Sequence, residues 1–131
     1  MGKKRLLAVS QNGFPEASQN QTALGICRQF ALEVGMRWAG GISFGMGGII
    51  AGRPLNERGR MVRNLRKALD LCAAALADGR PVPEEAVTLA ARPAMPHWLY
   101  IWMGNWGWKR AAKKHGTLHL LDRTPYLPPE E

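Results

Sequence analysis

Two short apolar runs are separated by a longer segment in which apolar residues recur every three or four positions. Residues 5–10 and 36–44 form the runs, and their near-continuous apolar character predicts two short buried strands. The segment between them has helical spacing, with Ser18 at an N-cap position and Gly35 as the stop. Such a unit predicts parallel strands joined by a right-handed crossover. The apolar positions of the helix are Ala23, Ile26, Cys27, Phe30, Ala31 and Val34.

Glycine and proline divide the rest of the chain into three further helical stretches. A second helix is predicted over residues 60–78, a short one opens at Pro83, and a longer one starts at Pro96. These elements predict an α/β fold with parallel strands in a single domain of 131 residues. We divide this domain into a βαβα core over residues 5–80 and a Pro- and Trp-rich helical extension over residues 81–131.

The formal net charge is +8, and Lys and Arg gather in three segments, at residues 3–5, 53–67 and 109–114. An excess of this size is typical of proteins that bind nucleotides, nucleic acid or membrane phosphate. A solvated basic surface has the same composition. We expect the solvated surface, and we do not expect nucleic acid or a membrane as a partner.

Cys27 and Cys72 fall on apolar positions of the first and second helices, which predicts buried thiols in a reducing compartment. The cysteines and the three histidines lack the spacing of metal ligands, so we expect no metal. Residues 1–15 lack the apolar core of a signal peptide, and no apolar stretch has the length of a membrane span. These features predict a cytoplasmic protein.

Glycine-containing loops follow both predicted strands. Residues 12–16 are Asn-Gly-Phe-Pro-Glu, and residues 45–48 are Gly-Met-Gly-Gly. Ligands of α/β proteins bind at the carboxyl ends of parallel strands, so these two loops are the candidate site. Asn12, Gly13 and Phe14 either form a packed turn or lie against a ring system, and the local sequence leaves both interpretations open.

The other candidates near these loops carry weaker signals. Glu16 has no evident acid–base partner, so no catalytic residue is assigned. The loop at residues 45–48 lacks the GxGxxG spacing, and Pro54 delays the helix that a dinucleotide site requires. Its glycines either permit a sharp strand exit or allow a flat ring or a partner to approach.

Four of the five tryptophans lie within residues 98–108, next to the last basic segment. This combination occurs in interfacial membrane helices and in aromatic platforms that bind nucleic acid. A helix that docks an aromatic face on its own domain has the same pattern, and we expect that arrangement. The face expected to pack consists of Leu99, Trp102, Met103 and Trp106.

The order of these motifs resembles the C-terminal half of flavodoxin-like NAD(P)H-dependent FMN reductases, from about Arg5 to Tyr126. The resemblance implies a partial flavodoxin-like doubly wound fold, whose complete parallel sheet has the strand order 2-1-3-4-5. Residues 6–10 and 38–44 would be its fourth and fifth strands. The motifs are the NGFPE loop, Trp38-Ala39-Gly40-Gly41, the GMGG loop, the basic helix, Gly104-Asn105-Trp106 and Pro125-Tyr126.

The same resemblance implies an FMN-dependent NAD(P)H oxidoreductase-type domain. In that family the loop after the fourth strand lies beside the flavin ring, which carries over to Asn12, Gly13, Phe14 and Glu16 as cofactor-binding residues. The family's Gly-Ser-Pro-type loop for the FMN phosphate has no counterpart before Arg5. We therefore expect the domain to be incomplete on its own. The alternative is a non-catalytic binding or assembly module.

The first predicted strand suggests how the domain is completed. A sheet of two strands leaves residues 6–10 with an unpaired edge that is apolar on both faces, and such an edge recruits another chain. We expect a homodimer or a complementary chain at this edge. Lys3, Lys4 and Arg5 precede it, and charges at an edge limit its uncontrolled growth.

Overall fold

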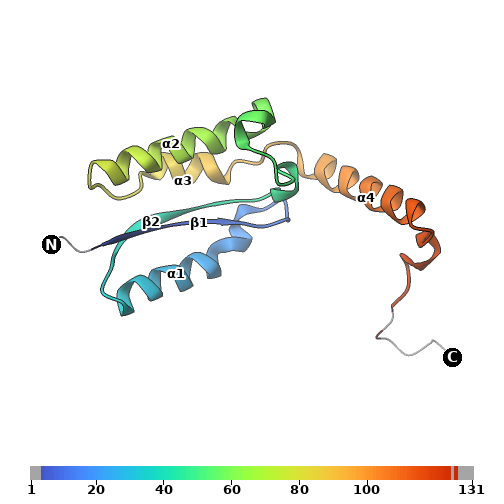
Figure 1. The fold of residues 1–131 in the computed structure, drawn as a ribbon, viewed down its shortest axis with the longest axis horizontal. Helices are drawn as coiled ribbons and strands as arrows, with labels where there is room; N and C mark the ends of the chain where they lie inside the picture. Colours follow the sequence, from blue (N-terminus) through green and yellow to red (C-terminus); the bar gives the residue numbers. More distant parts are fainter. Residues whose placement is uncertain (1–3, 125, 127–131) are drawn as a thin grey trace. The chain divides into compact units, whose positions relative to one another are not determined.

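Two parallel strands and the helix that connects them form the first half of the fold. The structure, a computed structural model, describes residues 4–124 and 126. Strand β1 (Arg5–Gln11) pairs in parallel with β2 (Arg37–Phe44), and helix α1 (Gln21–Glu33) joins them (Figure 1). Gly35 ends α1 with φ 71°, the conformation expected of a helix stop. The predicted βαβ unit is confirmed.

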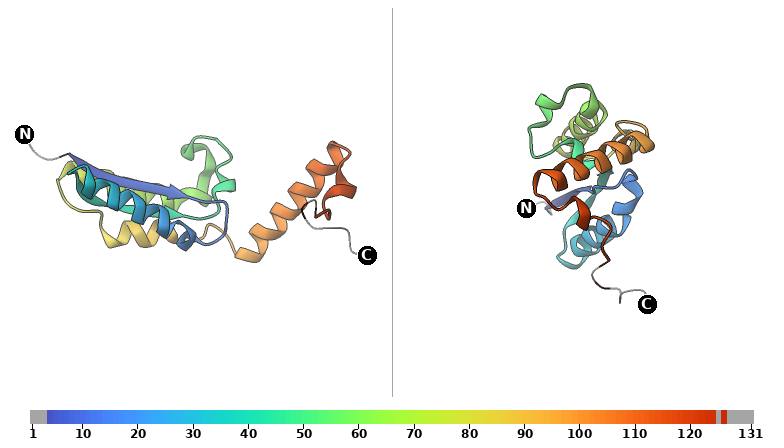
Figure 2. Two further views of the ribbon diagram at one scale, coloured as in Figure 1. Left: turned by 90° about the horizontal axis from the view of Figure 1, so that it is seen from below. Right: turned by 90° about the vertical axis from the view of Figure 1, so that its right-hand side faces the viewer.

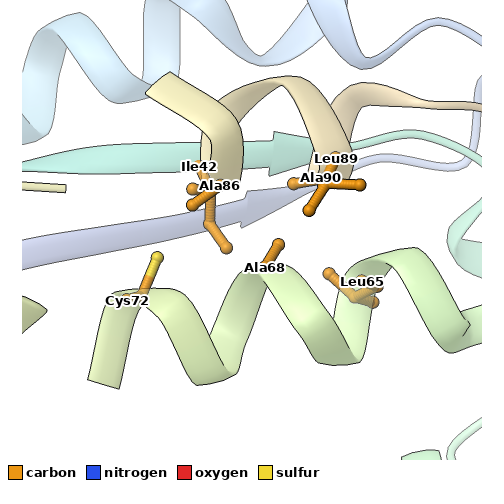
Figure 3. Close-up of a cluster of buried hydrophobic side chains, with 7 residues drawn as sticks. All are labelled: Ile42, Leu65, Ala68, Cys72, Ala86, Leu89 and Ala90. Carbon is orange, nitrogen blue, oxygen red and sulfur yellow. The ribbon is translucent and has the colours of Figure 1, made fainter. Parts of the chain in front are cut away.

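The elements form three layers, with α1 on one face of the sheet and two helices on the other (Figures 1 and 2). The two helices on the other face are α2 (Arg63–Ala77) and α3 (Glu84–Ala91). A cluster of buried side chains lies between this pair and β2 (Figure 3), and its many small members let the helices approach closely. It comprises Ile42, Leu65, Ala68, Cys72, Ala86, Leu89 and Ala90.

The chain divides into two compact units, Met1–His97 and Trp98–Glu131. The α/β class with parallel strands is confirmed. Helix α3 belongs to the first unit, because Ala86 is fully buried and Leu89 nearly so in the core cluster. Part of the region after residue 80 therefore completes the core.

The predicted N-cap of α1 is wrong. A short 3-10 helix, Ala17–Asn20, precedes α1, and Ser18 makes no capping hydrogen bond. The side-chain amide of Asn20 instead donates to the carbonyl of Phe44 at 3.1 Å. The hydroxyl of Ser10 donates to Asn20 Oδ1 at 3.2 Å. A buried bridge between the two strand ends therefore replaces the expected cap.

Helix α2 begins later than predicted. Two 3-10 segments, Gly47–Ile49 and Leu55–Val62, lie between β2 and α2. Gly59, with φ 58° and ψ −137°, interrupts the second segment, so regular helix starts at Arg63 instead of residue 60. The helix buries Leu65 and Cys72, and the apolar position expected for Cys72 is confirmed.

Helix α4 (His97–Lys114) starts at the last residue of the first unit, and the rest of it lies in the second unit with a short 3-10 helix, Leu118–Leu120. Within this unit Trp102 and Trp106 are not covered, at 60% and 55% exposed, and the packing of this aromatic face on the first unit stays a prediction. Large apolar residues surround most of the helix, so it has no single apolar stripe. The exposed ones are Trp98, Ile101, Trp102, Met103, Trp106 and Trp108.

Among the described residues, no helix combines the length and the apolar character that crossing a membrane requires. Lys3, at the basic start of the chain, and Pro125, in the final motif of the resemblance, lie outside the described residues.

Candidate functional site at the strand ends

The two loops that follow β1 and β2 lie against each other. The amide of Met46 donates to the carbonyl of Phe14 at 2.7 Å, and the amide of Gly47 donates to the carbonyl of Asn12 at 2.8 Å. A third bond, from the amide of Asn12 to the carbonyl of Phe44 at 3.3 Å, continues the strand pairing into the loops. The two glycine loops therefore form one hydrogen-bonded structure.

This close approach explains the glycines of the second loop. A Cβ atom at Gly45 would collide with the carbonyl oxygens of Phe14, at 2.7 Å, and Pro15. A Cβ at Gly47 would lie 2.8 Å from the carbonyl oxygen of Asn12. Met46 between them has φ 57° and is 1% exposed. The tight bend that Met46 adopts is therefore held by packing around its side chain.

The first loop is also shaped by its own side chains. Asn12 Oδ1 accepts a hydrogen bond from the amide of Phe14 at 2.9 Å, and Asn12 Nδ2 donates to the carbonyl of Glu16 at 3.1 Å. These two bonds fold residues 12–16 into a compact turn of the Asx type. The carboxylate of Glu16 lies 3.7 Å from His97 Nδ1, which gives the loop a polar end.

The tip of this turn faces outward. Phe14 is 63% exposed, which is unusual for a large aromatic side chain at a strand end. An added Cβ at Gly13 would meet no atom within 4 Å. The four predicted residues Asn12, Gly13, Phe14 and Glu16 are thus brought together, with an apolar ring and an exposed glycine at the tip. Such a surface is suited to contact with a flat ring.

The second loop does not have the form of a phosphate cradle. Phosphate sites at strand ends use backbone amides that point toward the anion. Here the amides of Met46 and Gly47 are already donated to the first loop. The loop at residues 45–48 therefore supports residues 12–16, and of the two interpretations of its glycines the structure favours close packing.

Two residues of this region were not predicted from the sequence. Asn20 bonds to both strand ends. His97 lies close to Glu16 although most of the first unit's sequence separates them. Asn20 is 5% exposed, and a polar residue just before the helix was a usable signal for it. No signal near His97 indicated its pairing with Glu16.

A concavity of about 460 Å³ lies beside α2, away from the strand-end loops. Its basic side chains belong to the Lys- and Arg-rich segment at residues 53–67 and are exposed. Lys67 forms an ion pair with Glu85 at 2.8 Å, in which both side chains are more than half exposed. Exposed charges of this kind are those of a solvated surface. The lining includes Arg60, Arg63, Arg66, Lys67 and Asp70.

The thiols are separate from the strand-end loops. Cys72 is buried in the core cluster as predicted, and this burial raises the pKa of its thiol. Cys27 on α1 is only partly buried, so its predicted full burial is wrong. Among the described residues, no group of three or more His, Cys, Asp and Glu side chains is arranged to hold a metal ion.

Comparison with known proteins adds no family to these observations: no family model, no curated protein and no solved structure matches the chain. The structure itself defines an α/β protein with a parallel strand pair and a compact loop site at the strand ends.

Proposed function

We propose that this chain forms the ring-binding side of a flavodoxin-like, FMN-dependent NAD(P)H oxidoreductase domain. The observation that carries the proposal is the outward-facing tip of residues 12–16 at the carboxyl end of β1, which is hydrogen-bonded to the second loop. Position and shape both suit a planar cofactor. The motif resemblance to FMN reductases supplies the identity of that cofactor.

Each residue of the loop has a distinct role in this proposal. Asn12 fixes the turn through its two side-chain hydrogen bonds. Gly13 lets the ring reach the backbone, and Phe14 packs against the ring. Glu16 and His97 form the polar end of the loop. When bound, FMN supplies the two-electron chemistry between NAD(P)H and an acceptor.

The described loops provide contacts for the ring, and two amides of the second loop are not available to a phosphate. The amides of Met46 and Gly47 are used within the protein. We therefore expect lumiflavin, which is the isoalloxazine ring without ribityl phosphate, to bind this loop. We expect the phosphate of FMN to be held by groups outside residues 12–16 and 45–48.

Titration of lumiflavin, followed by quenching of its fluorescence, tests the ring contact. Gly13→Val places a branched side chain where the ring approaches, and Phe14→Ala removes the exposed aromatic contact. Each is expected to weaken lumiflavin binding about tenfold or more, because a desolvated aromatic contact contributes on the order of 1.5 kcal/mol. Trp108→Ala is the control, since Trp108 is an exposed aromatic in the other unit.

Either of two results of the lumiflavin titration would contradict the proposal. If Trp108→Ala weakens lumiflavin binding and the two loop variants do not, the ring stacks on α4 and the loop is not a flavin site. If the wild-type protein does not bind lumiflavin at all, the ring contact proposed for residues 12–16 is wrong.

A second candidate function is a non-catalytic assembly module. It is favoured by β1, whose one described neighbour is β2 and whose Val9 is 50% exposed. Stable self-association without lumiflavin binding and without NAD(P)H oxidation in the presence of FMN would favour this candidate over the oxidoreductase.

A further inference from the structure

The free edge of β1 has a defined pattern of hydrogen-bonding groups. The carbonyl of Lys4 accepts from the amide of Arg37 at 2.9 Å, and the amide of Asn12 donates toward β2. Backbone groups alternate in direction along a strand, so even-numbered residues of β1 face β2 and odd-numbered residues face the free edge. The odd-numbered residues are Arg5, Leu7, Val9 and Gln11. Within the described part of the chain β2 is the one strand that pairs with β1, so these amides and carbonyls can bond to another strand.

The outer edge of β2 differs from that of β1. The amide of Val82 donates to the carbonyl of Ala39 at 2.7 Å, and the Val82 side chain covers Gly40 so closely that an added Cβ there would lie 2.7 Å from it. The segment before α3 therefore covers part of this edge. A further strand is expected at β1 rather than at β2.

An apolar flank of α1 lies on the same side as the free edge. Ile26, Phe30 and Val34 are spaced by four residues and are 65%, 53% and 52% exposed. Ala31, which is fully buried, marks the side of α1 that faces the sheet. In a right-handed crossover the flank carrying Phe30 lies toward β1, whereas Leu32 lies on the opposite flank. The edge and the flank together form one apolar surface.

We propose that this surface binds a second copy of the chain, with β1 antiparallel to its own copy and a two-fold axis through Ala8. In this register the odd-numbered residues form the hydrogen-bonded pairs, with Leu7 opposite Val9 of the second copy and Arg5 opposite Gln11. Two half-sheets then become one sheet of four strands. The exposed Val9 side chain is covered by Leu7 of the second copy on the same face.

The spacing of the helices fits this arrangement. Helix α1 contacts both strands of its own sheet, and a helix centred over two strands lies about half a strand spacing inside each. With strands about 4.8 Å apart, the two copies of α1 would lie about 10 Å from each other. Packed helices are separated by about 8–10 Å. The exposed side chains of Ile26 and Phe30 would fill the space between the two helices.

The charges favour an antiparallel copy over a parallel one. Lys4 and Arg5 precede the apolar part of β1, so parallel pairing would place these cations beside those of the second copy. Antiparallel pairing places Lys4, which is exposed, beside Asn12 of the other copy, at the start of the candidate flavin loop. Opposed like charges are destabilising across a strand pair, and this register avoids them.

This pairing gives the second copy a part in the flavin site, and that step rests on the proposed function. Lys4 of one copy supplies a cation next to residues 12–16 of the other, where the amides of Met46 and Gly47 are already bonded within the chain. The FMN phosphate is expected to interact with this ammonium group, since Lys binds phosphate as a point charge. The dimer would thus contribute two complete sites.

Light scattering and sedimentation test the assembly on the full chain. Wild-type protein is expected at twice the chain mass. Phe30→Asp is expected to give the monomer mass with unchanged helical circular dichroism, because Phe30 is already exposed within the chain. Leu32→Asp is the matched control on the opposite flank of α1 and is expected to remain dimeric.

Val9→Pro provides a second test, because the Val9 amide faces the free edge and its loss removes no bond to β2. A folded monomer is expected. A monomeric wild type at high concentration, or equal effects of the changes at residues 30 and 32, would overturn the assembly.

Comparison of FMN with lumiflavin tests the role of Lys4. FMN is expected to bind wild-type protein about tenfold more tightly than lumiflavin, and Lys4→Glu should remove this difference while lumiflavin binding and the dimer mass persist. If FMN retains its advantage in Lys4→Glu, the contribution of Lys4 is wrong. Failure of lumiflavin to bind contradicts the proposed function alone, because the mass measurement still decides the dimer.

Discussion

Gly45→Ala is the most direct test of the strand-end site. The new Cβ would lie 2.7 Å from the carbonyl oxygen of Phe14 and would also collide with that of Pro15. Both are backbone atoms, so no side chain can rotate to make room. Gly45 does not have a positive φ, so the expected effect comes from this collision alone.

The size of the effect follows from the bonds between the two loops. Moving them apart breaks the bonds from Met46 to Phe14 and from Gly47 to Asn12. Leaving the buried Met46 amide unpaired costs about 1–3 kcal/mol and losing the Gly47 bond about 0.5–1.5 kcal/mol, and replacing glycine by alanine returns about 0.4–1 kcal/mol through the unfolded state. We therefore expect Gly45→Ala to lower the free energy of unfolding by about 1–4 kcal/mol, a large fraction of the stability of a typical domain.

Gly13→Ala is the matched control. Gly13 also lacks a positive φ, and an added Cβ there meets no atom within 4 Å. Its free energy of unfolding should change by no more than about 0.5–1 kcal/mol. Urea unfolding followed by circular dichroism measures both variants, provided that the slope with denaturant is unchanged. Equal midpoints for the two variants would refute the hydrogen-bonded loop pair.

Three further predictions concern the core and the strand ends. Ile42→Ala should lower the free energy of unfolding by about 2–5 kcal/mol, because Ile42 is fully buried between β2 and the helix pair; a change below about 1 kcal/mol in urea unfolding would contradict this. Asn20→Ala should cost about 1–3 kcal/mol in the same assay, since it leaves the carbonyl of Phe44 without its side-chain donor. Cys27 should react with a thiol reagent before Cys72, whose burial raises its pKa and so suppresses the reactive thiolate. The folded chain keeps the Cys72 proton at pH values where the unfolded chain loses it. The contribution of Cys72 to the free energy of unfolding is therefore complete below the ordinary thiol pKa of about 8.5 and falls as the pH rises above it. Cys72→Ala should lack this pH dependence.

Periodicity predicted the elements whose identity depends on local sequence. The apolar runs that end before Gln11 and Gly45 form the parallel strands, and the helix predicted over residues 60–78 contains α2, which buries Leu65 and Cys72. These patterns are informative because burial of one or both faces repeats at the period of the element. Element ends were less predictable, because Gly59 interrupts a segment whose spacing still suited a helix.

Long-range contacts decided the features that periodicity left open. Ser18 had the spacing of an N-cap, yet Asn20 makes its bonds with Ser10 and Phe44, which come from two different strands. Local spacing contains no information about such partners. The tryptophans of α4 show the same limit, because an aromatic-rich helix has similar spacing whether its faces are covered or exposed.

The glycines at the end of β2 show how a three-dimensional contact changes a functional interpretation. From sequence, Gly45 and Gly47 were equally consistent with a sharp strand exit and with the approach of a ligand. Their neighbours are the carbonyls of residues 12–15, about 30 positions earlier in the chain, and these occupy the space that a ligand would need. The glycines therefore allow the backbone of the second loop to pack against that of the first. Of the two loops it is the first, through Gly13 and Phe14, that keeps an uncovered surface for a ring.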